Sequence, residues 1–180
     1  SLFESEDGAD LTHGGQVVRL PNPCLVRIGS VVVAVNTADL PVHLIRSGDV
    51  NRWEGGQRPH RFERFADHIL QQRNFYPLYP ADKSIPLDPA FYSDLKLTVR
   101  PDVMLTRSNL SYFAKSAGDD SLFVNPGMLA RHSTGGTFAK LVIQPVKKIV
   151  KEEASKTSDG ASFAAEDPVA RRTRVDIERI

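Results

Sequence analysis

The chain has 180 residues, of which 41% are hydrophobic and 25% are charged, a composition typical of globular domains. Its 23 basic residues nearly balance its 22 acidic ones, which argues against a broad field for gripping nucleic-acid phosphates but leaves room for a local basic patch. The single cysteine excludes an internal disulfide and a cysteine-based zinc site. No apolar run approaches the roughly 20 residues that a membrane span needs.

The first part of the chain predicts a loop followed by a β-hairpin. Residues 1–15 are polar and rich in glycine, so we expect a flexible loop. The runs 24–28 and 31–35 are rich in β-branched residues, and Gly29-Ser30 joins them. A two-residue connection with glycine first favours a type II′ turn. The valine run of the second strand predicts a strand that is covered on both faces.

Two helices are predicted next. Thr37 or Asp39 can cap a short helix through residues 44–45, with Pro41 in its first turn. Residues 60–73 predict a longer, amphipathic helix. Its apolar stripe follows helical spacing and consists of Phe62, Phe65, Ala66, Ile69 and Leu70. We expect the outward positions to be Arg61, Glu63, Arg64 and Asp67.

The rest of the chain predicts short strands separated by turns. We expect strands near residues 95–99, 103–106, 121–124, 137–143 and 175–177, and a helical segment that Ser108 caps and that carries Leu110 and Phe113. Residues 150–172 contain few large apolar side chains, which predicts a disordered insertion. This order of elements predicts an α/β or α+β fold, a layered β-sheet sandwich with flanking helices.

The residues alone indicate no catalytic centre and no cofactor. None of the five histidines forms a His-x-His pair, and His60 and His68 are too far apart for the i, i+4 spacing of a helical metal site. Arg73-Asn74 precedes two aromatic residues, as in a surface that stacks nucleic-acid bases. The proline-rich setting instead favours a protein interface or burial in the core. The candidate interface residues are Phe75, Tyr76, Leu78 and Tyr79.

Four blocks, at residues 20–24, 68–80, 100–105 and 124–139, together resemble the B subunits of eukaryotic DNA polymerase alpha. The helix-exit block, His68 to Pro80, is the most specific of them. The resemblance implies a calcineurin-like phosphoesterase fold, of which this chain would be the C-terminal part. That part would comprise residues 16–149 and 173–180, with the loop 1–15 before it and the insertion 150–172 within it.

The resemblance also implies that the phosphoesterase site has been dismantled. Active relatives of the fold carry a Gly-His-x-His motif just after the strand that corresponds to residues 101–105. Here the positions hold Arg107, Ser108, Asn109 and Leu110. Arginine and leucine do not ligate a hard divalent metal, and serine or asparagine alone ligates it weakly. The expectation is therefore a protein that is not an enzyme and holds no metal.

The implied function is that of a non-catalytic accessory subunit in the nucleus. Its partners would be the C-terminal zinc-binding region of the polymerase catalytic subunit and, within the same complex, the primase subunits. Contact with DNA would be indirect, and no membrane is involved. Two alternatives stay open at this point: an active metal-dependent phosphoesterase whose ligands lie elsewhere, and a DNA-binding module.

Overall fold

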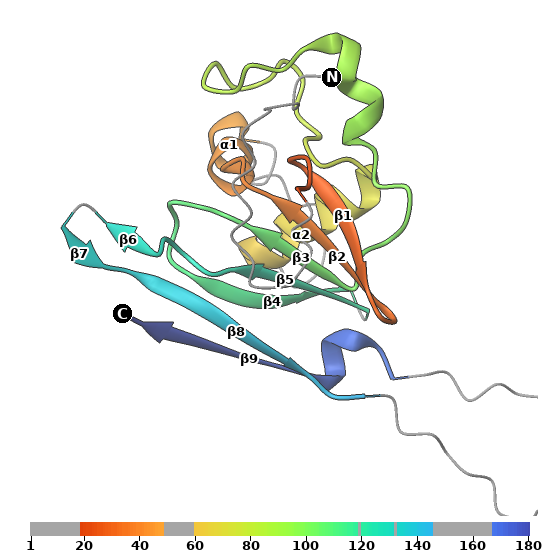
Figure 1. The fold of residues 1–180 in the computed structure, drawn as a ribbon. Coiled ribbons are helices and arrows are strands. Elements are labelled where there is room, and N and C mark those ends of the chain that lie inside the picture. Colours follow the sequence, from red (N-terminus) through yellow and green to blue (C-terminus); the bar gives the residue numbers. More distant parts are fainter. Residues whose placement is uncertain (1–18, 49–59, 119, 132, 146–166) are drawn as a thin grey trace, which may run out of the picture.

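A central five-stranded sheet of order β1-β2-β3-β5-β4 organises the chain (Figure 1). The computed structural model describes residues 19–48, 60–118, 120–131, 133–145 and 167–180. The strands of the sheet are β1 (Cys24–Ile28), β2 (Val31–Asn36), β3 (Val103–Thr106), β4 (Phe113–Ala117) and β5 (Ser121–Asn125). β2, β3 and β5 run parallel to one another, while β1 and β4 are antiparallel edge strands.

The predicted hairpin is confirmed by the pairing of β1 with β2. The two strands join through Gly29 and Ser30, with Ile28 opposite Val31 in the register. Gly29 has a φ of 61°, the positive value that the first central position of a type II′ turn requires and that glycine adopts without steric cost.

One face of the sheet is covered by α1 (Leu40–Ser47) and α2 (Arg61–Gln72). The predicted stripe of α2 is confirmed, since Phe65 and Ile69 are fully buried against Met104 and Phe123 of the sheet. Arg64 was expected to face outward, and this is wrong: it is only 6% exposed. The helix α2 is therefore buried beyond its apolar stripe, on the side that carries Arg64. The spacing of apolar residues does not indicate this additional burial. Neither α1 nor α2, nor either 3-10 segment that the structure describes, has the length and apolarity of a membrane-spanning helix.

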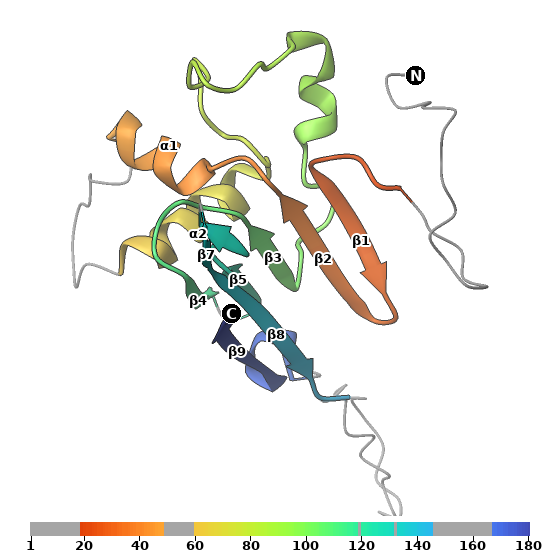
Figure 2. The ribbon, with the colours of Figure 1, turned by 60° about the vertical axis from the view of Figure 1, so that its left-hand side comes forward.

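The other face of the sheet is covered by a ribbon of two antiparallel strands, β8 (Thr137–Ile143) and β9 (Thr173–Arg179) (Figures 1 and 2). Leu141 and Val175 of the ribbon pack on Val103 and Val124 of the sheet. Because successive side chains of a strand point to opposite faces, the parallel strands supply both cores. β2 shows this directly: Ala34 joins the helix-side core and Val31 the ribbon-side core, so the strand is covered on both faces as predicted.

The connections between these elements complete the fold, and one of them differs from the prediction at the end of the insertion 150–172. The short strands β6 (Ala130–Arg131) and β7 (Thr134–Gly135) form a small hairpin before β8. Within the predicted insertion, residues 150–166 lie outside the described residues, as do the loop residues 1–15. The described end of that segment instead forms the 3-10 helix η3 (Val169–Arg172), whose Val169 is 5% exposed in the ribbon-side core.

Two further elements differ from the prediction. No strand forms at 95–99: Leu95 ends the 3-10 helix η2 (Pro89–Leu95), and only Lys96 makes an isolated bridge, to Asn74. Phe113 begins the strand β4 instead of lying in a helix. The helix expected after Ser108 does not form because side chains from distant elements form hydrogen bonds with the backbone of this segment, as described next.

Candidate functional site

The carboxyl ends of β2, β3 and β5 meet at one edge of the sheet, because these strands are parallel. They end in Asn36, Thr106 and Asn125, whose side chains are all buried. In open α/β sheets, ligands bind outside this edge. The loop 107–112, which carries the four positions predicted to be a dismantled metal site, follows β3 directly at this place. The edge is therefore the candidate functional site.

Asp39 is the acidic group of this edge, and both of its carboxylate oxygens accept hydrogen bonds from the loop 107–112. One carboxylate oxygen, Oδ1, accepts a hydrogen bond of 2.6 Å from the Ser108 hydroxyl. The other, Oδ2, accepts one of 2.9 Å from the backbone N–H of Asn109. Asp39 occupies the N-cap position of α1, as predicted, but its side chain makes no capping hydrogen bond. Since a buried carboxylate is costly unless it is hydrogen-bonded, these two donors stabilise Asp39 at its 8% exposure.

Asn125 braces the same loop from the end of β5. Its Oδ1 accepts hydrogen bonds from the backbone N–H groups of Ser108 and Gly127, each at 3.1 Å. Its Nδ2 donates to the carbonyls of Leu110 and Ser111, at 3.4 and 3.2 Å. The side chain is 0% exposed and uses both its acceptor and its donor group. The asparagine of the Asn-Pro-Gly turn thus fixes two loops at once.

Asn36 makes the equivalent connections at the end of β2. Its Nδ2 donates 2.9 Å to the carbonyl of Phe75, and its Oδ1 accepts from the backbone N–H of Ala38. Its own carbonyl accepts the N–H of Arg107. Sequence reasoning missed Asn36 and Asn125 as site residues. The sequence signal for both is an asparagine at the end of an apolar strand. A side-chain amide that is buried there needs hydrogen-bond partners, because unpaired buried polar groups are rare.

The structure brings the four predicted positions together in one loop and gives each a different environment. Ser108 is fully buried in the hydrogen bonds above, and Leu110 packs against the helix-side core. Arg107 is exposed, and its Nη2 donates 3.1 Å to Asn109 Oδ1 and lies 3.9 Å from the sulfur of Met128. Within the described ranges, no cluster of three histidine, cysteine, aspartate or glutamate residues is placed to hold a metal ion.

The predicted interface residues separate into core and surface. Phe75 and Tyr76 are 2% and 6% exposed and belong to the helix-side core, and Leu78 packs against that core. Tyr79, by contrast, is 88% exposed. In this structure only Tyr79 of the four presents a large surface to a partner.

Tyr76 owes its position to a polar network around His43. The Tyr76 hydroxyl lies 3.1 Å from His43 Nδ1 and accepts the backbone N–H of Asp82. Burial raises the pKa of Tyr76, and the hydrogen bond from Asp82 opposes that shift. On the other side of the ring, His43 Nε2 lies 3.3 Å from Ser84 Oγ. Hydrogen bonds from Ser84 lower the pKa of Asp82, with smaller contributions from His43 and Arg46. The network fastens the loop after α2 to α1.

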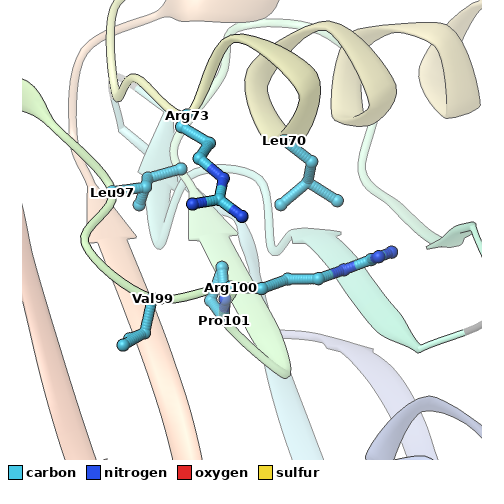
Figure 3. Close-up of a pocket in the computed structure, with 6 residues that line it drawn as sticks. All are labelled: Leu70, Arg73, Leu97, Val99, Arg100 and Pro101. Atoms are coloured by element: carbon cyan, nitrogen blue, oxygen red, sulfur yellow. The ribbon is translucent and has the colours of Figure 1, made fainter.

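A small hollow of about 110 Å³ lies near the opposite edge, between the end of α2 and the start of β3 (Figure 3). Arg73, which ends α2 with a φ of 48°, points its guanidinium into this hollow. Arg100 contributes only its stem, because its guanidinium extends away and donates to Ser121 Oγ and to the carbonyl of Ala117. Leu70, Leu97, Val99 and Pro101 form the apolar remainder.

Comparison with known proteins finds one family, the B subunits of DNA polymerases. The sequence model of a family that comprises the B subunits of DNA polymerases alpha and epsilon matches residues 8–115. Three curated relatives are B subunits of DNA polymerase alpha. The Mus musculus protein is 36% identical over 123 residues, which is 68% of this chain and 20% of the mouse protein. The Rattus norvegicus protein is 34% identical over 145 residues, covering 80% of this chain and 23% of the relative. The Schizosaccharomyces pombe protein is 35% identical over 133 residues, with coverages of 71% and 22%.

The chain thus spans about a fifth of the length of the curated relatives that it matches. The family match nevertheless includes β1, β2, α1, α2 and β3, together with the loop 107–112 at the carboxyl edge of the sheet. It therefore covers most of the helix-side core and the Asp39 hydrogen bonds. On this evidence the chain belongs to the family of DNA polymerase alpha and epsilon B subunits.

Proposed function

We propose that this chain is part of a non-catalytic accessory subunit of the DNA polymerase alpha–primase complex, acting in the nucleus in the initiation of DNA replication. The match of residues 8–115 to the family model carries this proposal. The names of the relatives add to it, since all three are B subunits of DNA polymerase alpha.

The finer part of the proposal is that the chain is the C-terminal part of an inactivated calcineurin-like phosphoesterase domain. The Asp39 geometry supports it: the carboxylate at the ligand-binding edge accepts hydrogen bonds from Ser108 and Asn109. A metal ion would have to compete with these donors. Arg107 adds a positive charge beside the same loop, which further disfavours a divalent cation.

The partner in this proposal is the C-terminal zinc-binding region of the polymerase catalytic subunit, with primase bound in the same complex. The chain's contribution would be a rigid surface, for which a sheet covered on both faces is well suited. Tyr79 is the candidate anchor, because aromatic side chains in the centre of an interface contribute strongly to binding. Contact with DNA would then be indirect.

Capture of partners from a nuclear extract tests this proposal. Tagged full-length protein that contains this chain should recover the polymerase alpha catalytic subunit and primase, identified by mass spectrometry. The Tyr79→Ala variant should recover less of both while melting at the same temperature as the parent. Recovery of neither partner by the folded parent protein would contradict the proposal.

A further inference from the structure

A second and larger hollow, of about 290 Å³, lies beside the candidate site. Its lining comes from the loop after β3, the turn after β5, the end of β7, the start of β8 and the second half of β9: Leu110, Ser111, Tyr112, Gly127, Met128, Gly135, Gly136, Thr137, Ile177 and Arg179. The tertiary fold therefore assembles this hollow from segments that are far apart in the chain. No function has been given to this hollow in the preceding sections.

The walls of the hollow are tightly fixed. A Cβ atom at Gly136 would overlap the backbone carbonyl of Met128, and one at Gly135 would overlap the carbonyl oxygen of Ile180. The backbone of Gly136 and Thr137 is hydrogen-bonded to residues 128–129, and Ile180 donates to Gly136. A hollow with such walls keeps its shape before a ligand arrives, which lowers the entropic cost of binding.

Cationic and apolar groups are combined around this hollow. Arg179 lines it, and Arg107 reaches its edge through the contact with Met128. Among the residues that the structure describes, neither arginine takes part in an ion pair. Three large apolar side chains in this part of the fold are exposed: Tyr112 of the lining at 56%, and Leu129 and Ile180, which are hydrogen-bonded to Gly136 through their backbones, at 66% and 61%. Exposed apolar side chains near cations that form no ion pair are features of an interaction site.

We propose that this hollow, which we call the Arg107–Arg179 pocket, binds an acidic segment of a partner protein. An aliphatic side chain of that segment enters between Leu110, Met128 and Ile177, and neighbouring carboxylates pair with the two guanidiniums. Guanidinium groups recognise carboxylates with two parallel hydrogen bonds, which gives both affinity and orientation. The site goes beyond the proposed accessory function and does not require that the polymerase catalytic subunit is the partner.

A polypeptide fits this pocket better than a nucleic acid does. Single-stranded nucleic acids are held by stacked aromatic side chains along a basic groove. Here Tyr112 is the one aromatic residue of the lining, beside the apolar side chains of Leu110, Met128 and Ile177. The whole chain carries a net charge of only +1. Charge complementarity at a hollow that combines an arginine with apolar side chains therefore favours a carboxylate next to an aliphatic side chain.

Fluorescence anisotropy with defined probes tests the pocket. The full chain is titrated into a short fluorescein-labelled peptide of alternating aspartate and leucine, into the same peptide with asparagine for aspartate, and into oligothymidylate of equal length. We expect saturable binding of the acidic peptide alone at about 0.1 M salt. Arg107→Glu and Arg179→Glu should each weaken it by about tenfold or more.

Arg27→Glu is the matched control, because it makes the same charge change at an exposed position beside the β1–β2 turn. It should leave peptide affinity within about twofold of the parent. All three variants should melt with the parent protein. No binding of the acidic peptide, or equal losses in all three variants, would overturn the pocket. Preferential binding of oligothymidylate that Arg107→Glu and Arg179→Glu abolish would overturn the choice of a peptide ligand.

Discussion

The hydroxyl of Ser108 donates a 2.6 Å hydrogen bond to Asp39, a residue 69 positions earlier in the chain. This bond joins the start of α1 to the loop after β3, at the edge of the sheet where α/β folds bind ligands. A carboxylate that could serve a ligand instead holds a loop. The polar groups of this edge thus hold neighbouring loops in place, which supports the proposed role as a scaffold.

Replacing Asp39 by asparagine should destabilise the protein. The amide of the variant has one acceptor oxygen where the carboxylate has two, so in the same geometry either the hydroxyl of Ser108 or the N–H of Asn109 loses its acceptor. A buried polar group left without a partner costs about 1–3 kcal/mol. We expect this loss in the free energy of unfolding, measured by urea denaturation. Asp94→Asn, at an exposed carboxylate, should change stability by less than about 0.5 kcal/mol.

A double-mutant cycle separates the pair from its surroundings. If the Asp39–Ser108 bond is formed in solution, Asp39→Asn and Ser108→Ala should couple by about 0.5–3 kcal/mol. Strict additivity of the two substitutions would show that the bond contributes nothing in solution.

The helix-side core should depend strongly on Phe65. Its side chain is fully buried between α2 and the sheet, and Phe65→Ala should cost about 3–5 kcal/mol. Phe91→Ala makes the same chemical change at a side chain that is 49% exposed on η2, where no residue is buried. Thermal melting should therefore separate the two variants clearly. Similar melting temperatures for both would mean that α2 does not pack on the sheet as described.

Asp67 makes a pH-dependent prediction. Burial raises its pKa above the ordinary 3.8, the charge of Glu63 adds to the shift, and His68 and Arg100 oppose it. A raised pKa in the folded state means that Asp67 favours folding below pH 3.8 and that this contribution is lost as the pH rises through the folded-state pKa. Asp67→Asn should therefore raise the melting temperature at neutral pH, and the gain should shrink toward acidic pH.

Asp176 provides a control of opposite sign. Hydrogen bonds from Arg174 lower its pKa, so its carboxylate supports folding above the ordinary pKa and loses this effect as the pH falls. Asp176→Asn should lower the melting temperature at neutral pH. A melting temperature of Asp67→Asn at or below that of the parent at neutral pH would refute the assigned shift.

The protein should not hydrolyse a generic phosphodiester such as bis(p-nitrophenyl) phosphate in the presence of manganese. The reason is the engagement of Asp39 by Ser108 and Asn109, together with the charge of Arg107 in the same loop. Release of p-nitrophenolate measures the reaction. The parent and the Asp39→Asn variant are purified in the same way. Turnover by the parent that is absent from the folded variant would mean that the edge is still a catalytic site.

Local patterns were enough to predict α2, the β1–β2 hairpin and the strands β5, β8 and β9. Each has a strong signal within a few residues, such as the helical spacing of Phe65 and Ile69 or the Gly29-Ser30 turn. The strand expected at 95–99 failed because alternating apolar residues pair only where a neighbouring strand is available, and here Lys96 finds a single bridge.

The site was predicted only in part, for a physical reason. The family resemblance located the loop of Arg107 and Ser108, but the groups that hold the loop come from elsewhere in the chain. Asp39 looked like a helix cap because nothing near it in sequence shows that its partners lie about 70 residues away. Likewise, the sequence left open whether Phe75 and Tyr76 lie in an interface or in the core, because composition alone does not distinguish a buried aromatic residue from an exposed one.

The most direct test of the account is co-elution with the polymerase. Full-length protein containing this chain is mixed with the C-terminal region of the DNA polymerase alpha catalytic subunit and passed over a size-exclusion column. We expect one complex for the parent and for Arg107→Ala, and a weakened complex for Phe65→Ala, because loss of the fully buried ring loosens the rigid surface. Separate elution of the two proteins, with the parent shown to be folded by its circular dichroism spectrum, would contradict the proposal of an accessory subunit.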